Sequence, residues 1–220
     1  MKLCYIGEHF QQKPWLEKMK LLRQAEKDED RVTILEFANA SGSHRVKLTL
    51  VGKSKKPRCF KIINKTALPV HYMHQKSACM NPTLFSEWFH DCFVPEVKKY
   101  LRKLKLKKAI LLMDNAPAHQ DVETIKAENF TCIFVPPHTT AILQSMDQGV
   151  IESMKRSYRK QLESKLLFEV DGDEEEVACS IGQFWKALTL KDCVHMIKKA
   201  WESVAEHTLK SSWRKLAPYL

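Results

Sequence analysis

The sequence is poor in the residues and runs that mark specialised structural classes. Only six glycines and nine prolines occur among 220 residues, which excludes collagen-like and low-complexity chains. The longest uninterrupted apolar run, Ala109–Met113, is far shorter than the roughly 20 residues of a membrane-spanning helix. Residues 1–10 have no continuous apolar region, so we expect no secretory signal.

Several site signatures are also missing. The seven cysteines are odd in number and none lies two to four residues from another, which argues against a disulfide framework and a cysteine-rich zinc site. The glycine-rich dinucleotide and P-loop motifs do not occur, and neither does the HExxH zinc motif. We therefore expect reduced, buried thiols and no chemistry of those three kinds.

The chain is instead rich in apolar and basic residues. Hydrophobic residues make up 44% of it, enough for the packed core of one domain, or of one domain with a small appendage. The net charge of +10 indicates a polyanionic partner, nucleic acid first and an acidic membrane surface second. The basic residues form three clusters: Lys53, Lys55, Lys56, Arg58 and Lys61; Lys98, Lys99, Arg102, Lys103, Lys105, Lys107 and Lys108; and Lys155, Arg156, Arg159 and Lys160. Each alone is equally typical of a solvated face, and the second also of a nuclear localisation patch.

Hydrophobic patterning predicts an alternating α/β chain. The expected strands are Arg31–Ala38, His44–Val51, Ala109–Met113 and Phe130–Val135, the first two forming a hairpin and the last two buried. The expected helices begin at Asn81–Pro82, resume after Pro95 as Glu96–Lys108, and continue with Gln120–Glu128 and about Leu143–Leu167. We predict a domain over residues 1–170, an acidic linker over 171–180 and a helical extension over 181–220.

Two carboxylates occupy positions suited to chemistry. Asp114 directly follows the buried strand Ala109–Met113, and ligands bind at the carboxyl ends of strands in open α/β sheets. Asp147 lies 33 positions later, at the start of the long helix and on its apolar side. The path between them can bring the two together as a hard-oxygen site for Mg²⁺ or Mn²⁺. Each is also consistent with an ordinary helix-cap or turn aspartate.

Three segments in fixed order then carry a family resemblance. Asp114-Asn-Ala-Pro-Ala-His119, Phe134-Val-Pro-Pro-His-Thr-Thr140 and Gln144-Ser-Met-Asp-Gln-Gly-Val-Ile151 resemble the DDE endonuclease domain of the pogo/Tigger/jerky transposases, which is also that of centromere protein B. The likeness spans about residues 28–217. It implies an α/β, RNase H-like mixed sheet flanked by helices, with a helical C-terminal extension. It also implies DNA as substrate. We expect no membrane partner.

The resemblance assigns roles by position. Asp114 and Asp147 correspond to the second and third catalytic acids and to ligands of Mg²⁺ or Mn²⁺, with Asn115, His119, Gln148 and Gly149 as supporting motif residues. The family's first aspartate, in an Asn-x-Asp-Glu-Thr-Gly stretch, is not found. Glu8 is the nearest candidate, although an ordinary surface acid is the simpler interpretation. We also expect no helix-turn-helix module.

Three functions follow, and we favour the first. It is a nuclear DNA-binding protein with an incomplete ancestral nuclease site, in which Lys155, Arg156, Arg159 and Lys160 contact DNA, together with Lys53, Lys55, Lys56 and Arg58. The alternatives are an active Mg-dependent endonuclease or transposase using Glu8, Asp114 and Asp147, and a protein-binding scaffold without nucleic-acid contact. The oligomeric state is left open, with a homo-oligomer among the options.

Overall fold

The computed structural model describes residues 2–11, 32–64, 67–114, 125–136, 144–169, 183–214 and 216. A six-stranded sheet with the order β4-β3-β2-β1-β5-β6 lies at its centre. The strands are β1 (Lys2–Gln11), β2 (Thr33–Asn39), β3 (Thr49–Gly52), β4 (His71–His74), β5 (Lys108–Met113) and β6 (Phe130–Phe134). Strand β2 runs antiparallel to both β1 and β3, whereas the other neighbouring pairs are parallel. The predicted mixed α/β class is therefore confirmed.

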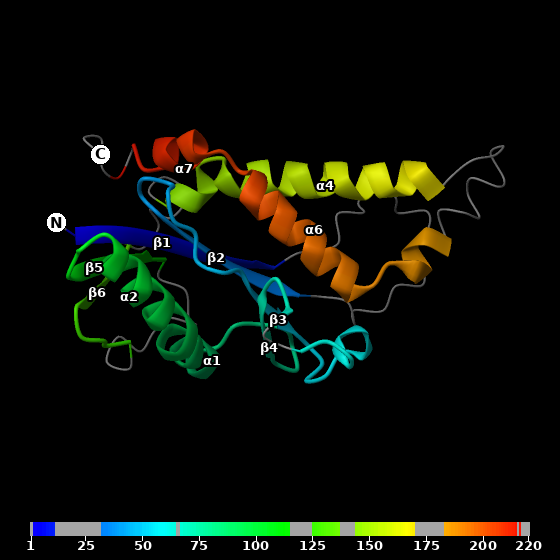
Figure 1. Cartoon of the computed structure of the whole chain (residues 1–220), viewed down its shortest axis with the longest axis horizontal. Helices are drawn as coiled ribbons and strands as arrows, with labels where there is room; N and C mark the ends of the chain where they lie inside the picture. Colours follow the sequence, from blue (N-terminus) through cyan, green and yellow to red (C-terminus); the bar gives the residue numbers. More distant parts are fainter. Residues whose placement is uncertain are drawn as a thin grey trace.

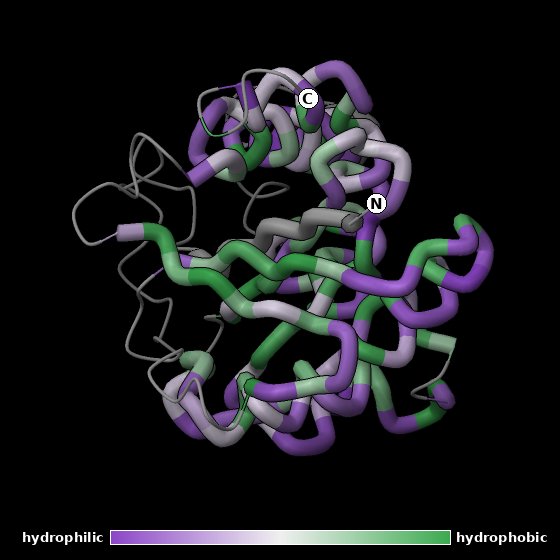
Figure 2. The backbone as a smooth tube through the Cα atoms, turned by 90° about the vertical axis from the view of Figure 1, so that its left-hand side faces the viewer, coloured by the Kyte–Doolittle hydropathy of each residue, from purple (hydrophilic) through white to green (hydrophobic). Residues whose placement is uncertain are grey.

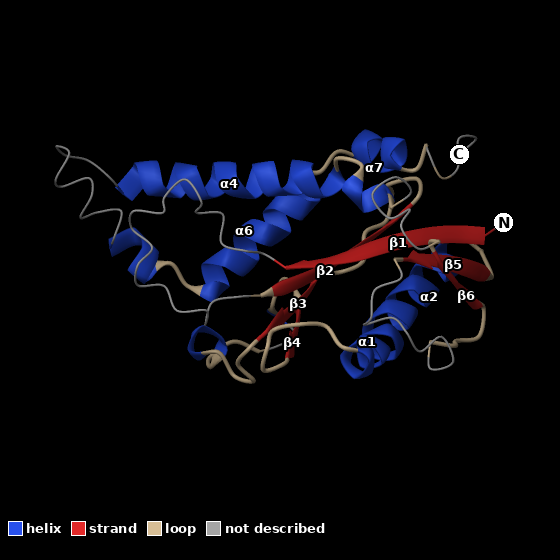
Figure 3. Ribbon diagram, turned by 180° about the vertical axis from the view of Figure 1, so that it is seen from behind, coloured by secondary structure: helices blue, strands red, loops and turns tan. Residues whose placement is uncertain are grey.

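Helices cover both faces of this sheet (Figures 1 and 3). Helices α4 (Val150–Glu169), α6 (Leu190–Ser203) and α7 (Glu206–Ser212) lie on one side, and α1 (Pro82–Trp88) and α2 (Val94–Lys103) on the other. The shorter turns are η3 (Arg58–Phe60), the π-helical η5 (Phe89–Phe93) and η7 (Ser145–Asp147). We call the two faces the α4 side and the α2 side.

Strand β2 shows how the chain fills both sides. Successive side chains of a strand point to opposite faces. Ile34 and Ala38 accordingly pack into the α4-side core, while Leu35 and Phe37 pack into the α2-side core. The strands at the centre of the molecule are strongly hydrophobic, and polar residues gather in the outer turns (Figure 2). The long helix and the last two helices share the α4-side core through residues such as Met154 and Trp201.

Helix α1 begins as its sequence predicts. The Asn81 side chain accepts a hydrogen bond from the Leu84 N–H at 2.8 Å, and Pro82 occupies the first helical turn. Pro95, however, does not interrupt the helical path. The π-helical turn η5 precedes it, and the Val94 N–H bonds to the Phe89 carbonyl one residue further back than in an α-helix. This wider turn accommodates the proline, which cannot donate a hydrogen bond and crowds the preceding turn.

Other boundaries differ from the sequence prediction. Strand β3 begins at Thr49 rather than at His44, and Arg45 forms only an isolated bridge with Ala38. Helix α2 ends at Lys103, because the turn through Lys105, at φ 56°, leads into β5. Strand β6 is an edge strand with alternating exposure rather than a buried strand. Helix α4 begins at Val150, after η7.

Some predictions fall outside the described residues. Most of the expected helix Gln120–Glu128 does, and Ile125–Glu128 form a bend and a turn rather than a helix. The predicted linker, 171–180, also lies outside. Five cysteines whose side chains are described are free thiols, and they are half-buried rather than buried as predicted: Cys59, Cys79, Cys92, Cys132 and Cys193. None of the helices within the described residues is long and apolar enough to span a membrane.

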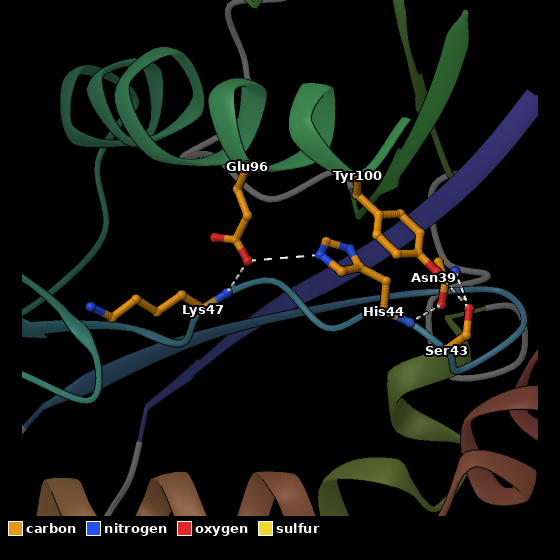
Figure 4. Close-up of polar contacts among 6 residues, drawn as sticks. All are labelled: Asn39, Ser43, His44, Lys47, Glu96 and Tyr100. Atoms are coloured by element: carbon orange, nitrogen blue, oxygen red, sulfur yellow. Dashed lines mark hydrogen bonds and ion pairs between the residues drawn. The ribbon is translucent and has the colours of Figure 1, made fainter. Parts of the chain in front are cut away.

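A polar network ties the loop after β2 to helix α2 (Figure 4). The rings of His44 and Tyr100 stack at 4.0 Å, and Glu96 accepts a hydrogen bond from the Lys47 N–H at 3.0 Å. Burial, with Lys103 nearby, lowers the pKa of His44 to about 4. His44 is therefore neutral at pH 7, and its 3.9 Å approach to Glu96 is not an ion pair there.

Candidate functional site

Asp147 lies in the short η7 turn that precedes α4. Its side chain is exposed, and η7 packs against β1 at the centre of the sheet. Gln148 ends the turn, and Gly149 follows with φ +88°, a backbone conformation that residues other than glycine rarely adopt. The Gln-Gly pair thus redirects the chain from η7 into α4, with Asp147 directly before this bend.

An open groove of about 360 Å³ runs along α4 from Asp147. Its lining residues recur at helical spacing: Asp147, Ile151, Glu152, Lys155, Arg156 and Arg159. Arg156 and Glu152 form an ion pair at 3.0 Å, one helical turn apart. The groove therefore joins the predicted acid Asp147 to three cations of the third basic cluster.

The other predicted basic residues lie elsewhere. Lys160 is exposed but does not line the groove. Lys55, Lys56 and Arg58 are exposed in the segment that follows β3, and Lys53 at its start is half-buried. The groove thus gathers part of the third cluster and does not include the first.

Asp114 directly follows β5 and is half-buried. Its neighbours fix its side of the sheet, because Leu112 belongs to the α4-side core whereas Leu111 and Met113 belong to the α2-side core. By the alternation of the strand, position 114 continues on the α4 side. The predicted supporting residues Asn115 and His119 lie outside the described residues.

The backbone of β1 places Glu8 between two other acidic positions. Ile6 of β1 is in register with Leu112 of β5. Glu8 and Asp114 each follow two residues later, so the same register places them side by side. On its other side, Glu8 is in direct register with Glu36 of β2. Directly paired positions in neighbouring strands lie on the same face of a sheet. Positions 8, 36 and 114 therefore form a row across three neighbouring strands.

Sequence reasoning missed Glu36. It is fully buried, and neither of its carboxylate oxygens has a hydrogen-bond partner within the described residues. Burial raises its pKa to about 8, an effect that Lys155 opposes and Asp147 increases. Glu36 thus lies within electrostatic range of two groove residues. The available signal was an acid in the middle of the otherwise apolar run Ile34–Ala38, whose alternate residues face the two cores.

Two polar residues next to Asp147 show the same feature. Gln144 and Ser145 are fully buried, and the side-chain polar atoms of both have no hydrogen-bond partner among the described residues. Buried polar groups without partners are rare in proteins, so each calls for an explanation. Within the described residues, the polar side-chain atoms of Gln144, Ser145 and Glu36 lack the hydrogen bonds that would offset their burial.

The acids suit a divalent cation in their chemistry, since Mg²⁺ and Mn²⁺ prefer carboxylate oxygens. The carboxylate oxygens of Glu36 have no hydrogen-bond partner among the described residues, lie within electrostatic range of Asp147, and are of the type that such an ion prefers. Among the described residues, however, no three histidine, cysteine, aspartate or glutamate side chains are grouped closely enough to hold a metal. A cation here would depend on one or two protein carboxylates and on water or phosphate for its remaining ligands.

Comparisons with known proteins identify relatives of the chain. The chain is 38% identical over 198 residues to human Tigger transposable element-derived protein 7, covering 86% of this chain and 36% of the relative. It is 33% identical over 192 residues to mouse Jerky protein, covering 86% and 31%. For the human Jerky protein homolog the identity is 34% over 193 residues, again covering 86% and 31%. The chain thus spans about a third of the length of these curated relatives.

No solved structure matches the chain. A family model described as a DDE superfamily endonuclease matches residues 29–213, which include Asp114 and Asp147. The resemblance drawn from the motifs around these two acids is therefore confirmed, and the chain belongs to the DDE superfamily endonuclease family.

Proposed function

We propose that the chain is a nuclear DNA-binding domain that derives from a pogo/Tigger/jerky-type transposase and whose nuclease site is incomplete. The observation that carries this proposal is the groove along α4, where Lys155, Arg156 and Arg159 lie beside Asp147. Three cations spaced along one helix match the negative charges of a nucleic-acid backbone. The relatives' names, which include a transposable element, support the same origin.

We further propose that the fold is RNase H-like. The antiparallel strands β1, β2 and β3, joined through β1 to the parallel pair β5 and β6, support this assignment. Strand β4 is then an added edge strand. In such a fold, the acids of β1, of the end of β5 and of the start of the helix that follows β6, here α4, face one another. The row of positions 8, 36 and 114 beneath Asp147 is consistent with that arrangement.

Salt-dependent binding tests the DNA proposal. We expect the 220-residue chain to bind a fluorescent duplex, with log affinity falling against log salt at a slope of about −2.7 for three neutralised phosphates. Changing Lys155, Arg156 and Arg159 together to Gln should abolish most of this slope. The matched control removes three exposed cations from the α2 side, Lys99, Arg102 and Lys103. An equal loss in both variants, or no salt slope at all, would contradict a specific interface and favour the protein-binding scaffold.

The second candidate is an active metal-dependent endonuclease. The observation in its favour is the register of β1 with β5. Ile6 pairs with Leu112, so Glu8, two residues later, lies beside the end of β5. Bound cations would supply Lewis-acid activation of a phosphodiester. The favoured proposal expects no nicking of supercoiled DNA with Mg²⁺ or Mn²⁺. Nicking by the wild-type chain that disappears in both Asp114→Asn and Glu8→Gln would establish the second candidate instead.

A further inference from the structure

The Glu36 carboxyl is not explained by packing. It lies in the middle of a sheet strand with 0% exposure and no hydrogen-bond partner for either oxygen within the described part of the chain. An isolated buried carboxyl costs several kcal/mol relative to water. The flanking residues on the same face, Ile34 and Ala38, are apolar core residues, so an apolar side chain would fit this position better. Such a cost is typical of a group that is kept for binding or chemistry.

The position of Glu36 directs it to the groove. Strand alternation places it on the α4 side, with Ile34 and Ala38. The two groups that act on its charge are Lys155 and Asp147, and both line the groove. The η7 turn that carries Asp147 packs against β1, the strand next to Glu36. Glu36 thus lies on the groove's side of the sheet, buried behind the lining residues, on a strand that the motif comparison does not assign to the site.

We propose that Glu36 and Asp147 together bind one divalent cation, so that strand β2 contributes a ligand to this site. Mg²⁺ and Mn²⁺ are held by one or two carboxylates, with water or phosphate completing their coordination. The pair supplies such a donor set, one carboxylate buried and the other exposed at the groove. The cation would neutralise the buried carboxylate, and the nearby Lys155 would weaken its binding by charge repulsion.

Direct metal binding tests this proposal without DNA. We expect Mn²⁺, titrated into the 220-residue chain and followed by electron paramagnetic resonance, to bind one site at up to low-millimolar concentrations. Glu36→Gln and Asp147→Asn should each weaken binding about tenfold or more, since each removes one of few ligands. Glu152→Gln is the matched control, because Glu152 lines the same groove but pairs with Arg156. Its effect should stay within about twofold. Lys155→Met should strengthen binding several-fold.

Folding is checked on the same samples by circular dichroism. Glu36→Asp provides a second variant that keeps the charge but shortens the side chain, and we expect it to weaken Mn²⁺ binding less than Glu36→Gln does. Wild-type affinity in a folded Glu36→Gln variant would overturn the proposal, and so would an absence of Mn²⁺ binding by the wild-type chain. The outcome is independent of the DNA titration, so either proposal can fail while the other stands.

Discussion

The two sides of the sheet differ in whether a carboxyl group removed from water has a hydrogen-bond donor. On the α2 side, burial raises the pKa of Glu96, but the hydrogen bond from the Lys47 N–H opposes this rise. On the α4 side, Glu36 is more deeply buried and has no such donor among the described residues. A satisfied polar group costs little and an unsatisfied one costs much, so burial of Glu96 costs less than burial of Glu36. Among the described residues, no hydrogen bond offsets the cost of burying Glu36.

The aromatic residues of the two cores also differ in the contacts that they make. The α2-side core contains a compact group in which Trp88 stacks on Phe37 at 4.6 Å and contacts Phe85 and Phe93. On the α4 side, Trp201 instead lies under the Arg45 guanidinium, which donates hydrogen bonds to the carbonyls of Trp201 and Val204 at the end of α6. A basic side chain thus closes that helix end.

The largest expected effect is on the α2 side. Trp88→Ala removes a fully buried ring and should lower the free energy of unfolding by about 3–5 kcal/mol. Urea denaturation measures this loss. Mn²⁺ affinity of the folded variant should not change, because Trp88 lies on the opposite side of the sheet from the groove. A large loss of Mn²⁺ affinity in folded protein would show that the two sides are coupled.

Glu36→Gln should stabilise the protein at high pH in the presence of a chelator. The folded pKa of about 8 exceeds the ordinary value of 4.5, so the wild type loses stability as pH rises from about 4.5 to 8. The variant lacks this loss and should gain up to about 5 kcal/mol at pH 9 relative to pH 4, because the pKa of Glu36 rises from 4.5 to about 8 and each pKa unit corresponds to about 1.4 kcal/mol. Parallel stability curves for the two proteins across this range would contradict an unpaired buried carboxyl.

The contribution of His44, on the α2 side, to the free energy of unfolding should have the opposite pH dependence. Its folded pKa of about 4 lies below the ordinary 6.5, so its contribution is complete above pH 6.5 and is lost as pH falls toward 4. Solvent screening of this partly exposed ring reduces the expected loss to about 1–2 kcal/mol. Chemical denaturation of the wild type and His44→Gln at pH 7 and pH 4.5 measures it. The difference between the two proteins should shrink at the lower pH.

The smallest effects concern two helix caps, one on each side. Asn81→Ala on α1 and Thr189→Ala on α6 should each cost about 1 kcal/mol, because each side chain accepts a hydrogen bond from an N–H of the first turn. Thermal unfolding measures both changes. Neither cap lines the groove, so DNA and Mn²⁺ binding should match the wild type. A binding defect in Thr189→Ala alone would place α6 in the interface.

Local signals predicted many of the elements well. Asn81-Pro82 marked the start of α1, and the apolar run Ala109–Met113 marked β5, because caps and uninterrupted apolar runs act over a few residues. The stripe from Val150 to Tyr158 does lie in the α4-side core. The exposure of β6 was not predicted, since an edge strand and a central one can have the same apolar composition.

Some features of the candidate site can likewise be predicted from local sequence, whereas others depend on the tertiary structure. The sequence by itself determined the family and the acids Asp114 and Asp147, because a motif is read from neighbouring residues. The roles of Asp114, Asp147 and Glu8 in catalysis stay predictions. Only the tertiary structure decided that Lys155, Arg156 and Arg159 share a groove with Asp147, whereas Lys160 and the first basic cluster do not. It also brought Glu36 within electrostatic range of Lys155 and Asp147, because strand pairing and helix packing bring together residues more than a hundred positions apart.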